Sequence, residues 1–117
     1  MRGEPILIRT GADYIESLRN RNLRVYFLGE RIAEPVDHPV IRPSINAVAR
    51  TYDLALEDPV LATAPSSLSG LPVNRFLHIT ESPADVVAQN RMQRRLGQLT
   101  GTCFQRCVGM DAINALF

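Results

Sequence analysis

Two cysteines, the only ones in the chain, lie four residues apart near its end, in the segment from Gly101 to Asp111. If this segment is helical, Cys103 and Cys107 share one face, with Cβ atoms roughly 5–6 Å apart. A relaxed disulfide needs Cβ atoms about 3.5–4.5 Å apart, so a bridge between these residues would be strained. The pair is therefore suited to bind a shared metal ion or iron–sulfur cluster, and it supplies half of the usual four ligands.

The same cysteines also fit a simpler interpretation, in which they pack in the core as small hydrophobic side chains. A zinc site of the Cys₂His₂ type would need His38 and His78 as its other ligands. His38 stands in an Asp-His-Pro stretch that is expected to be a loop, and His78 stands between Leu77 and Ile79. These surroundings disfavour zinc but leave the alternative open.

Polar residues near the cysteines are further candidates. Gln105 and Arg106 would project from other faces of such a helix, where either could reach a ligand beside a cluster. For Arg106 the competing interpretation is a surface salt bridge. Asp111, one turn beyond Cys107, fits either a hydrogen-bond acceptor behind the ligands or a surface carboxylate. A stripe at i, i+3, i+4 spacing could bind a phosphate-bearing ligand or be a solvated helix face, and it comprises Arg91, Arg94 and Arg95.

Composition limits the class of protein. The 117 residues are 45% hydrophobic, which is enough for the core of one small domain spanning residues 1–117. A net charge of +1 gives no reason to expect a nucleic-acid partner. The sequence has no apolar run of the roughly 18–20 residues that span a membrane and no signal peptide at its start. Two cysteines without an export signal indicate the reducing cytoplasm.

The elements that must position these residues are mainly helical. Thr10 and Asp13 form a capping-box pattern that predicts a short helix. Ser44 is expected to cap a second helix that ends at Asp58-Pro59, and Ser82-Pro83 predicts the start of a third. Breaks are expected at Gly97 and Gly101, followed by a final helix that carries both cysteines.

A small β-hairpin is predicted where residues 23–28 and 31–33 flank Gly29-Glu30. Residues 62–72 are rich in Ser, Pro and Gly and are interpreted as a loop, and residues 75–79 as a short strand or an extended arm. The final helix, up to Phe117, shows none of the usual terminating residues. We therefore expect this helix to be cut in its middle.

The stretch from Leu96 to Ala115 resembles the 4-hydroxybutyryl-CoA dehydratase/vinylacetyl-CoA Δ-isomerase branch of the 4-hydroxyphenylacetate 3-hydroxylase superfamily. Residues 14–18, 24–32 and 36–46 match the same superfamily, so the resemblance covers nearly the whole chain from about Ile8. It implies the N-terminal helical domain of an acyl-CoA-dehydrogenase-like flavoprotein that is a homotetramer when complete. Cys-Phe-Gln-Arg-Cys is the motif that separates the dehydratase from the hydroxylases.

By this resemblance, Cys103 and Cys107 are two ligands of a [4Fe–4S] cluster, with a histidine and a third cysteine following much further along the family's chain. The implied cofactors are this cluster and FAD, and the implied substrates are 4-hydroxybutyryl-CoA and vinylacetyl-CoA, both converted to crotonyl-CoA. Gln105, the candidate catalytic residue, would orient flavin or substrate. The chain alone is expected to be inactive. The alternatives are a reduced-flavin-dependent aromatic hydroxylase, a truncated helical module that is not an enzyme, and a zinc-stabilised module.

Overall fold

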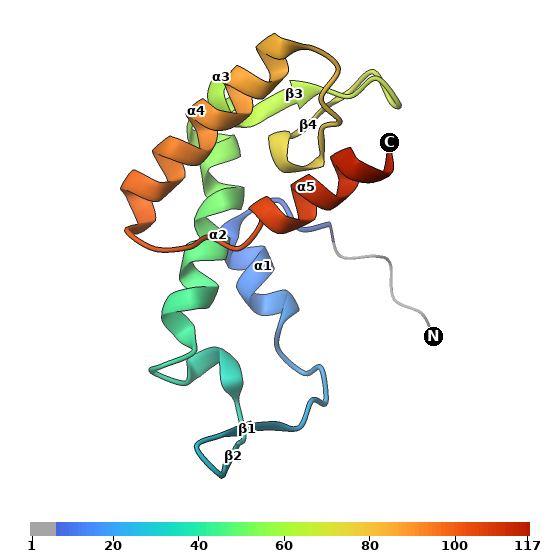
Figure 1. Cartoon of the computed structure of the whole chain (residues 1–117). Coiled ribbons are helices and arrows are strands. Elements are labelled where there is room, and N and C mark those ends of the chain that lie inside the picture. The colour runs from blue at the N-terminus through green and yellow to red at the C-terminus, as the bar shows by residue number, and fades with distance from the viewer. Residues whose placement is uncertain (1–6) are drawn as a thin grey trace.

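The computed structural model describes residues 7–117, which form a mainly helical body with two short antiparallel hairpins (Figure 1). This confirms the predicted fold class, although a single hairpin was expected. In chain order the elements are α1 (Gly11–Ser17), β1 (Val25–Phe27), β2 (Glu30–Ile32), the 3₁₀ turn η1 (Pro35–Asp37), α2 (Arg42–Glu57), α3 (Pro59–Ala62), β3 (Thr63–Pro65), β4 (Pro72–Asn74), the 3₁₀ turn η2 (Arg75–Leu77), α4 (Pro83–Thr100) and α5 (Cys107–Leu116).

One apolar cluster holds the helical body together. It draws on α2, α3, η2, α4, the segment that follows α4, and α5, so the last residues of the chain share a core with its middle. Met92 and Leu96 contribute the buried face of α4 and are fully shielded from solvent. The complete cluster comprises Leu54, Ala62, Phe76, Met92, Leu96, Phe104 and Met110. None of the helices among residues 7–117 is long and apolar enough to cross a membrane.

Helix starts follow the predicted capping chemistry at two of three places. Thr10 Oγ1 accepts a hydrogen bond from the backbone N–H of Asp13 at 3.0 Å, and the Asp13 carboxylate accepts from the N–H of Thr10. Ser82 caps α4 in the same way. The prediction for α2 was wrong, because this helix begins at Arg42 and not after Ser44. Pro43 lies in its first turn, where the missing N–H costs no helical hydrogen bond.

The end of α4 was only partly predicted. The helix continues through Gly97 and stops at Gly101, which adopts the left-handed conformation with φ of 63°. Glycine reaches this conformation without a steric penalty, so it is the usual residue at such a helix end.

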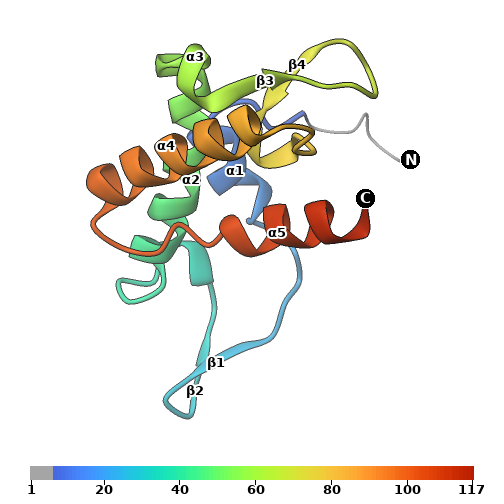
Figure 2. The same cartoon turned by 45° about the horizontal axis from the view of Figure 1, so that its top comes forward.

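The hairpins differ from their predictions in detail. β1 and β2 pair as expected, but the turn is Leu28-Gly29, with φ of 49° and 82°, and Glu30 belongs to the strand. The strand pair β3–β4 was not predicted: β3 lies in the region interpreted as a loop, and β4 begins at its last residue. Residues 75–77 form the turn η2 and not a strand. In Figures 1 and 2 the β1–β2 hairpin lies at the far end of the body from β3–β4.

Close packing of α1 against α2 depends on Gly11. Its N–H donates to Asp53 Oδ1 at 2.8 Å, and a Cβ atom at this position would lie 2.8 Å from the carbonyl oxygen of Ala49. We expect Gly11→Ala to destabilise the protein by about 1–3 kcal/mol, as overpacking does. The matched control is Gly97→Ala, whose new methyl group meets nothing within 4 Å. It should stabilise α4 by about 0.5–1 kcal/mol, and denaturant unfolding of both variants measures the contrast.

Acid should destabilise the fold through carboxylates that accept hydrogen bonds at helix starts. The backbone N–H of Thr10 is the main cause that lowers the pKa of Asp13, and that of Glu81 is the main cause for Asp85. A lowered folded-state pKa stabilises the fold above the unfolded value, which is about 4, and this stabilisation is lost as the pH falls through the folded value. Thermal unfolding between about pH 7 and pH 3 should show this loss, and Asp85→Asn should make it smaller.

Candidate functional site

The two cysteines flank a bend between α4 and α5, and this corrects the prediction that both lie on one helix. Cys107 is the first residue of α5, whereas Cys103 lies in irregular chain. The argument from i, i+4 spacing on a helix face therefore does not apply. Cys103 and Gln105 are exposed and Cys107 is half-buried, while Phe104 is buried and Arg106 half-buried. Both cysteines are free thiols.

Phe104 and Arg106 anchor the bend to the helical body. The Phe104 ring packs against Phe76 of η2 with ring centroids 5.9 Å apart. The Arg106 guanidinium lies between two rings, with Cζ 4.5 Å from the centroid of Tyr52 and 4.8 Å from that of Phe76. Its Nη1 also donates a hydrogen bond to Thr51 Oγ1 at 3.1 Å. Arg106 thus forms no surface salt bridge among the described residues, and that interpretation was wrong.

Gln105 occupies the tip of the bend in an uncommon backbone conformation. Its φ is 63°, a left-handed value that costs a non-glycine residue roughly 1–2 kcal/mol. Such strain is concentrated at functional sites, where the surrounding structure fixes it. Gln105 borders a hollow of about 280 Å³ whose other walls come from η2, α5 and the residue before α5, namely Phe76, Leu77, Arg106, Gly109, Met110 and Ile113.

The start of α5 is a favourable place for an anionic group. No side chain caps this helix, so its first backbone N–H groups have no side-chain acceptor. Unpaired N–H groups and the helix dipole favour negative charge at a helix start. Cys107 occupies this position, which suits a ligand that binds as a thiolate.

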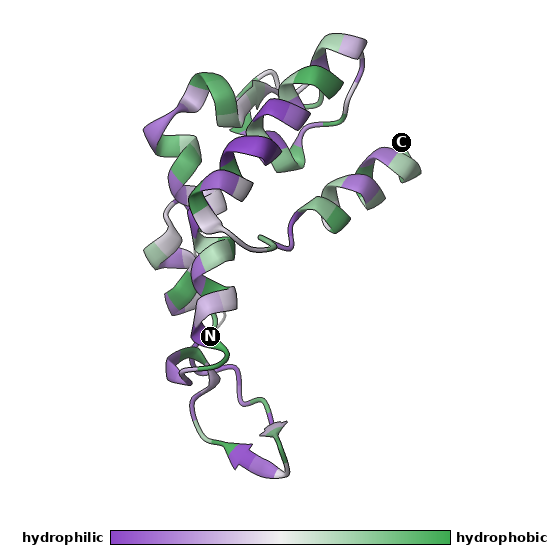
Figure 3. Cartoon of the chain, turned by 60° about the vertical axis from the view of Figure 1, so that its left-hand side comes forward, coloured by the Kyte–Doolittle hydropathy of each residue, from purple (hydrophilic) through white to green (hydrophobic). Residues whose placement is uncertain are grey.

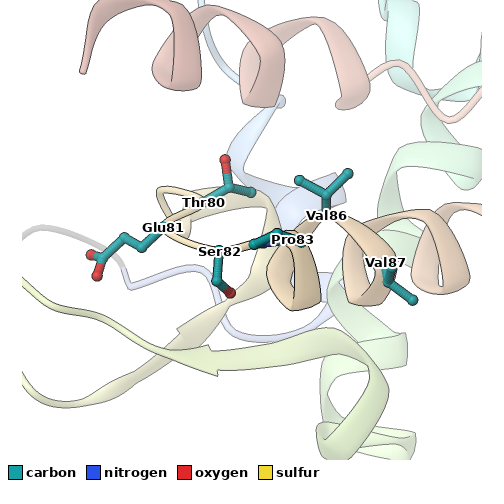
Figure 4. A pocket seen from close by; sticks show the side chains of 6 residues that line it. All are labelled: Thr80, Glu81, Ser82, Pro83, Val86 and Val87. Carbon is teal, nitrogen blue, oxygen red and sulfur yellow. The ribbon is translucent and has the colours of Figure 1, made fainter.

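Contacts further along α5 fix its direction. The backbone N–H and the hydroxyl of Thr80 both donate to Asn114 Oδ1, each at 2.7 Å. Figure 4 shows Thr80 beside Ser82 and Pro83 at the start of α4, with its side chain turned away from that of Ser82. Here a largely apolar hollow of about 670 Å³ carries no thiol or imidazole. We assign it no chemistry.

The described residues hold no complete metal site. Among residues 7–117, no three His, Cys, Asp or Glu side chains lie close enough together to bind a metal ion. His38 Nδ1 accepts a hydrogen bond from the N–H of Val40, and buried His78 lies with Nε2 3.3 Å from Asp85 Oδ2. Neither histidine joins the cysteines, so the zinc alternative was wrong for this part of the chain. The two free thiols could supply at most two of the four ligands that an iron–sulfur cluster usually has.

The remaining candidates lie apart from a defined site. Arg91, Arg94 and Arg95 are all exposed on α4, which agrees with a solvated helix face and leaves the phosphate hypothesis without support. Asp111 is exposed on α5. The sandwich around Arg106 was missed, because Tyr52, Phe76 and Arg106 are distant in sequence and no local pattern predicts that they meet.

Together these features define a class: a helical module that presents a Cys-x₃-Cys pair and a strained glutamine on a bend anchored to its core. The family model described as 4-hydroxyphenylacetate 3-hydroxylase N terminal matches residues 10–117. The chain therefore belongs to this family.

Its relatives fall into two groups. The 4-hydroxybutyryl-CoA dehydratase/vinylacetyl-CoA-Δ-isomerase of Clostridium aminobutyricum is 54% identical over 114 residues, which are 95% of this chain and 23% of the relative. A structure of the oxygen-tolerant archaeal 4-hydroxybutyryl-CoA dehydratase from N. maritimus superposes with a TM-score of 0.91 at 71% identity, covering 94% of this chain and 22% of that one. The chain thus spans less than a quarter of these relatives.

The second group consists of oxygenases. The oxygenase component of 4-hydroxyphenylacetate 3-monooxygenase complexed with FAD superposes with a TM-score of 0.64 at 26% identity, covering 77% of this chain and 19% of that one. The corresponding component from Thermus thermophilus is 42% identical over 48 residues, which are 41% of this chain and 10% of the relative. Both groups share the fold, and the dehydratases match it over more of the chain and at higher identity.

Proposed function

We propose that residues 1–117 are the N-terminal helical domain of a larger subunit that converts 4-hydroxybutyryl-CoA and vinylacetyl-CoA to crotonyl-CoA. The observation that carries the proposal is a pair of free thiols, one exposed and one half-buried, at the two ends of an anchored bend. Identities of 54% and 71% with two dehydratases support it, against 26% and 42% with the oxygenases. The complete subunit would bind FAD, act in the cytoplasm and assemble as a homotetramer.

Cys103 and Cys107 would bind one side of a [4Fe–4S] cluster, and ligands from the rest of the subunit would bind the other. When bound, the cluster would supply a Lewis acid that polarises the departing hydroxyl without needing a proton donor. The chain's own contribution is geometric. The body holds Phe104 and Arg106, so the bend leaves Cys103 and Gln105 exposed and Cys107 half-buried at the edge of the core. That amide can donate and accept hydrogen bonds, which would orient substrate or flavin.

Activity of the complete subunit tests the proposal against the hydroxylase alternative. We expect anaerobic conversion of 4-hydroxybutyryl-CoA to crotonyl-CoA and water, with no reductant or oxygen consumed. Oxygen-dependent hydroxylation of a phenol, with no crotonyl-CoA formed, would instead assign the protein to the oxygenases. Residues 1–117 alone should turn over neither substrate, because they provide only two cluster ligands.

A further inference from the structure

Arg106 is a half-buried cation without a carboxylate partner in the described part of the chain. No Asp or Glu oxygen of residues 7–117 lies within 4.0 Å of its guanidinium nitrogens. Burial lowers the pKa of Arg106 below its usual range, yet an arginine side chain stays charged in proteins. Burying a cation without an anion is unfavourable, and an apolar side chain could fill the same space. Packing alone therefore does not account for an arginine here.

Arg106 contacts a buried part of α2. Thr51, which accepts its hydrogen bond, is 1% exposed, and its own hydroxyl donates to the carbonyl of Val48 at 2.6 Å. Tyr52 also stacks on Tyr14 of α1, with ring centroids 5.2 Å apart. A planar guanidinium can stack between two rings and donate at its edge at the same time, whereas a lysine ammonium cannot. The sandwich therefore fixes both the position and the orientation of residue 106.

Only two residues of the Cys-Phe-Gln-Arg-Cys motif are anchored in this way. Phe104 packs in the core cluster beside Phe76, whereas Arg106 contacts three side chains immediately before Cys107. Gln105, between them, keeps a left-handed backbone that the two anchors must enforce. We propose that Arg106 is a positioning residue, whose stacking between Tyr52 and Phe76 sets the geometry in which Cys103 and Cys107 bind their cluster. The inference rests on the proposed function.

The test compares Arg106→Met and Arg106→Lys in the complete subunit, purified without oxygen. The matched control is Arg50→Met, which removes another half-buried arginine of the same body whose role is an ion pair with Glu57 at 2.7 Å. The iron that each protein retains after exposure to a chelator is measured beside its FAD content and melting temperature. We expect roughly ten-fold less iron in both Arg106 variants, as for lost supporting contacts at metal sites, with FAD unchanged. The control should lose no iron.

Full iron retention in Arg106→Met would overturn the inference. So would full retention in Arg106→Lys, since that result would assign the effect to charge and not to stacking. A fall in iron equal to that of the control would show a merely structural role.

A second readout does not depend on the cluster. In cluster-free protein, the rate at which a small alkylating reagent modifies Cys107 reports how well the bend is held. Arg106→Met should raise this rate by about five-fold or more through local opening, and Arg50→Met should not. Equal rates in the two variants would contradict the inference. If the unmodified subunit binds no iron, the proposed function fails, and the alkylation rates still decide whether Arg106 holds the bend.

Discussion

Replacing Cys103 or Cys107 by alanine in the complete subunit is expected to abolish cluster binding and turnover. In the proposed site each change removes one of four ligands, and among residues 7–117 no His, Cys, Asp or Glu is grouped with the cysteines so that it could replace the lost ligand. Formation of crotonyl-CoA should fall at least about a hundred-fold, because the Lewis-acid contribution of a metal centre is worth several kcal/mol. Iron, acid-labile sulfide and product formation are the quantities to measure.

The fold should survive both changes. Cys103 is exposed, and Cys107 only borders the core cluster, so the melting temperature should change little. Thr102→Ala, at an exposed neighbouring position, is the matched control and should keep both iron and activity. Either cysteine variant with full iron and full activity would show that the ligand assignment is wrong.

Replacing Gln105 by glycine should separate the backbone of the bend from the amide that it carries. Glycine adopts a φ of 63° without strain, so the variant should be as stable as the parent protein or slightly more stable, and should retain its cluster. Turnover should nevertheless fall by about a hundred-fold or more, the usual cost of removing one preorganised hydrogen-bond donor. Gln105→Ala should lose the same activity and also keep the backbone strain.

The control is Gln98→Ala, which removes an exposed amide from α4. Steady-state kinetics, iron content and unfolding of the variants give the three readouts. If Gln105→Gly turns over substrate at the parent rate, Gln105 has no role in the reaction. If the turnover and the iron content of Gln105→Gly fall together, the side chain acts in cluster assembly and not in orienting substrate or flavin.

Local chemistry made much of the fold predictable. The capping patterns at Thr10 and Ser82 and the glycine at 101 mark helix ends by interactions within four residues, so the sequence alone reveals them. The β3–β4 pair escaped prediction, because Pro65 and Pro72 lie opposite each other at its end and proline usually argues against a strand.

The site was only partly predictable for a related reason. Residue types and the family resemblance made Cys103, Gln105 and Cys107 candidates, but their arrangement depends on contacts between distant segments. Phe104 reaches Phe76, and Arg106 reaches Tyr52, across tens of residues. These contacts replace the expected helix with a bend and decide which side chains face outward.

Features beside the cysteine pair fit the proposal that this domain supplies part of a larger site. The uncapped start of α5 and the strained Gln105 are features that cost stability, and the chain's own core gains nothing from them. Exposed apolar side chains on α5, including Val108 and Leu116, also fit a domain that packs against the rest of a larger subunit. Figure 3 shows this helix, with mixed hydrophobic and hydrophilic residues, projecting from the body at its C-terminal end.

Iron and acid-labile sulfide in the complete subunit, purified anaerobically from its native source, test the central claim most directly. The account predicts about four iron and four sulfide per subunit, as one [4Fe–4S] cluster requires, together with bound FAD. A complete subunit that binds FAD but contains neither iron nor sulfide would contradict it, and would assign Cys103 and Cys107 to a role without metal.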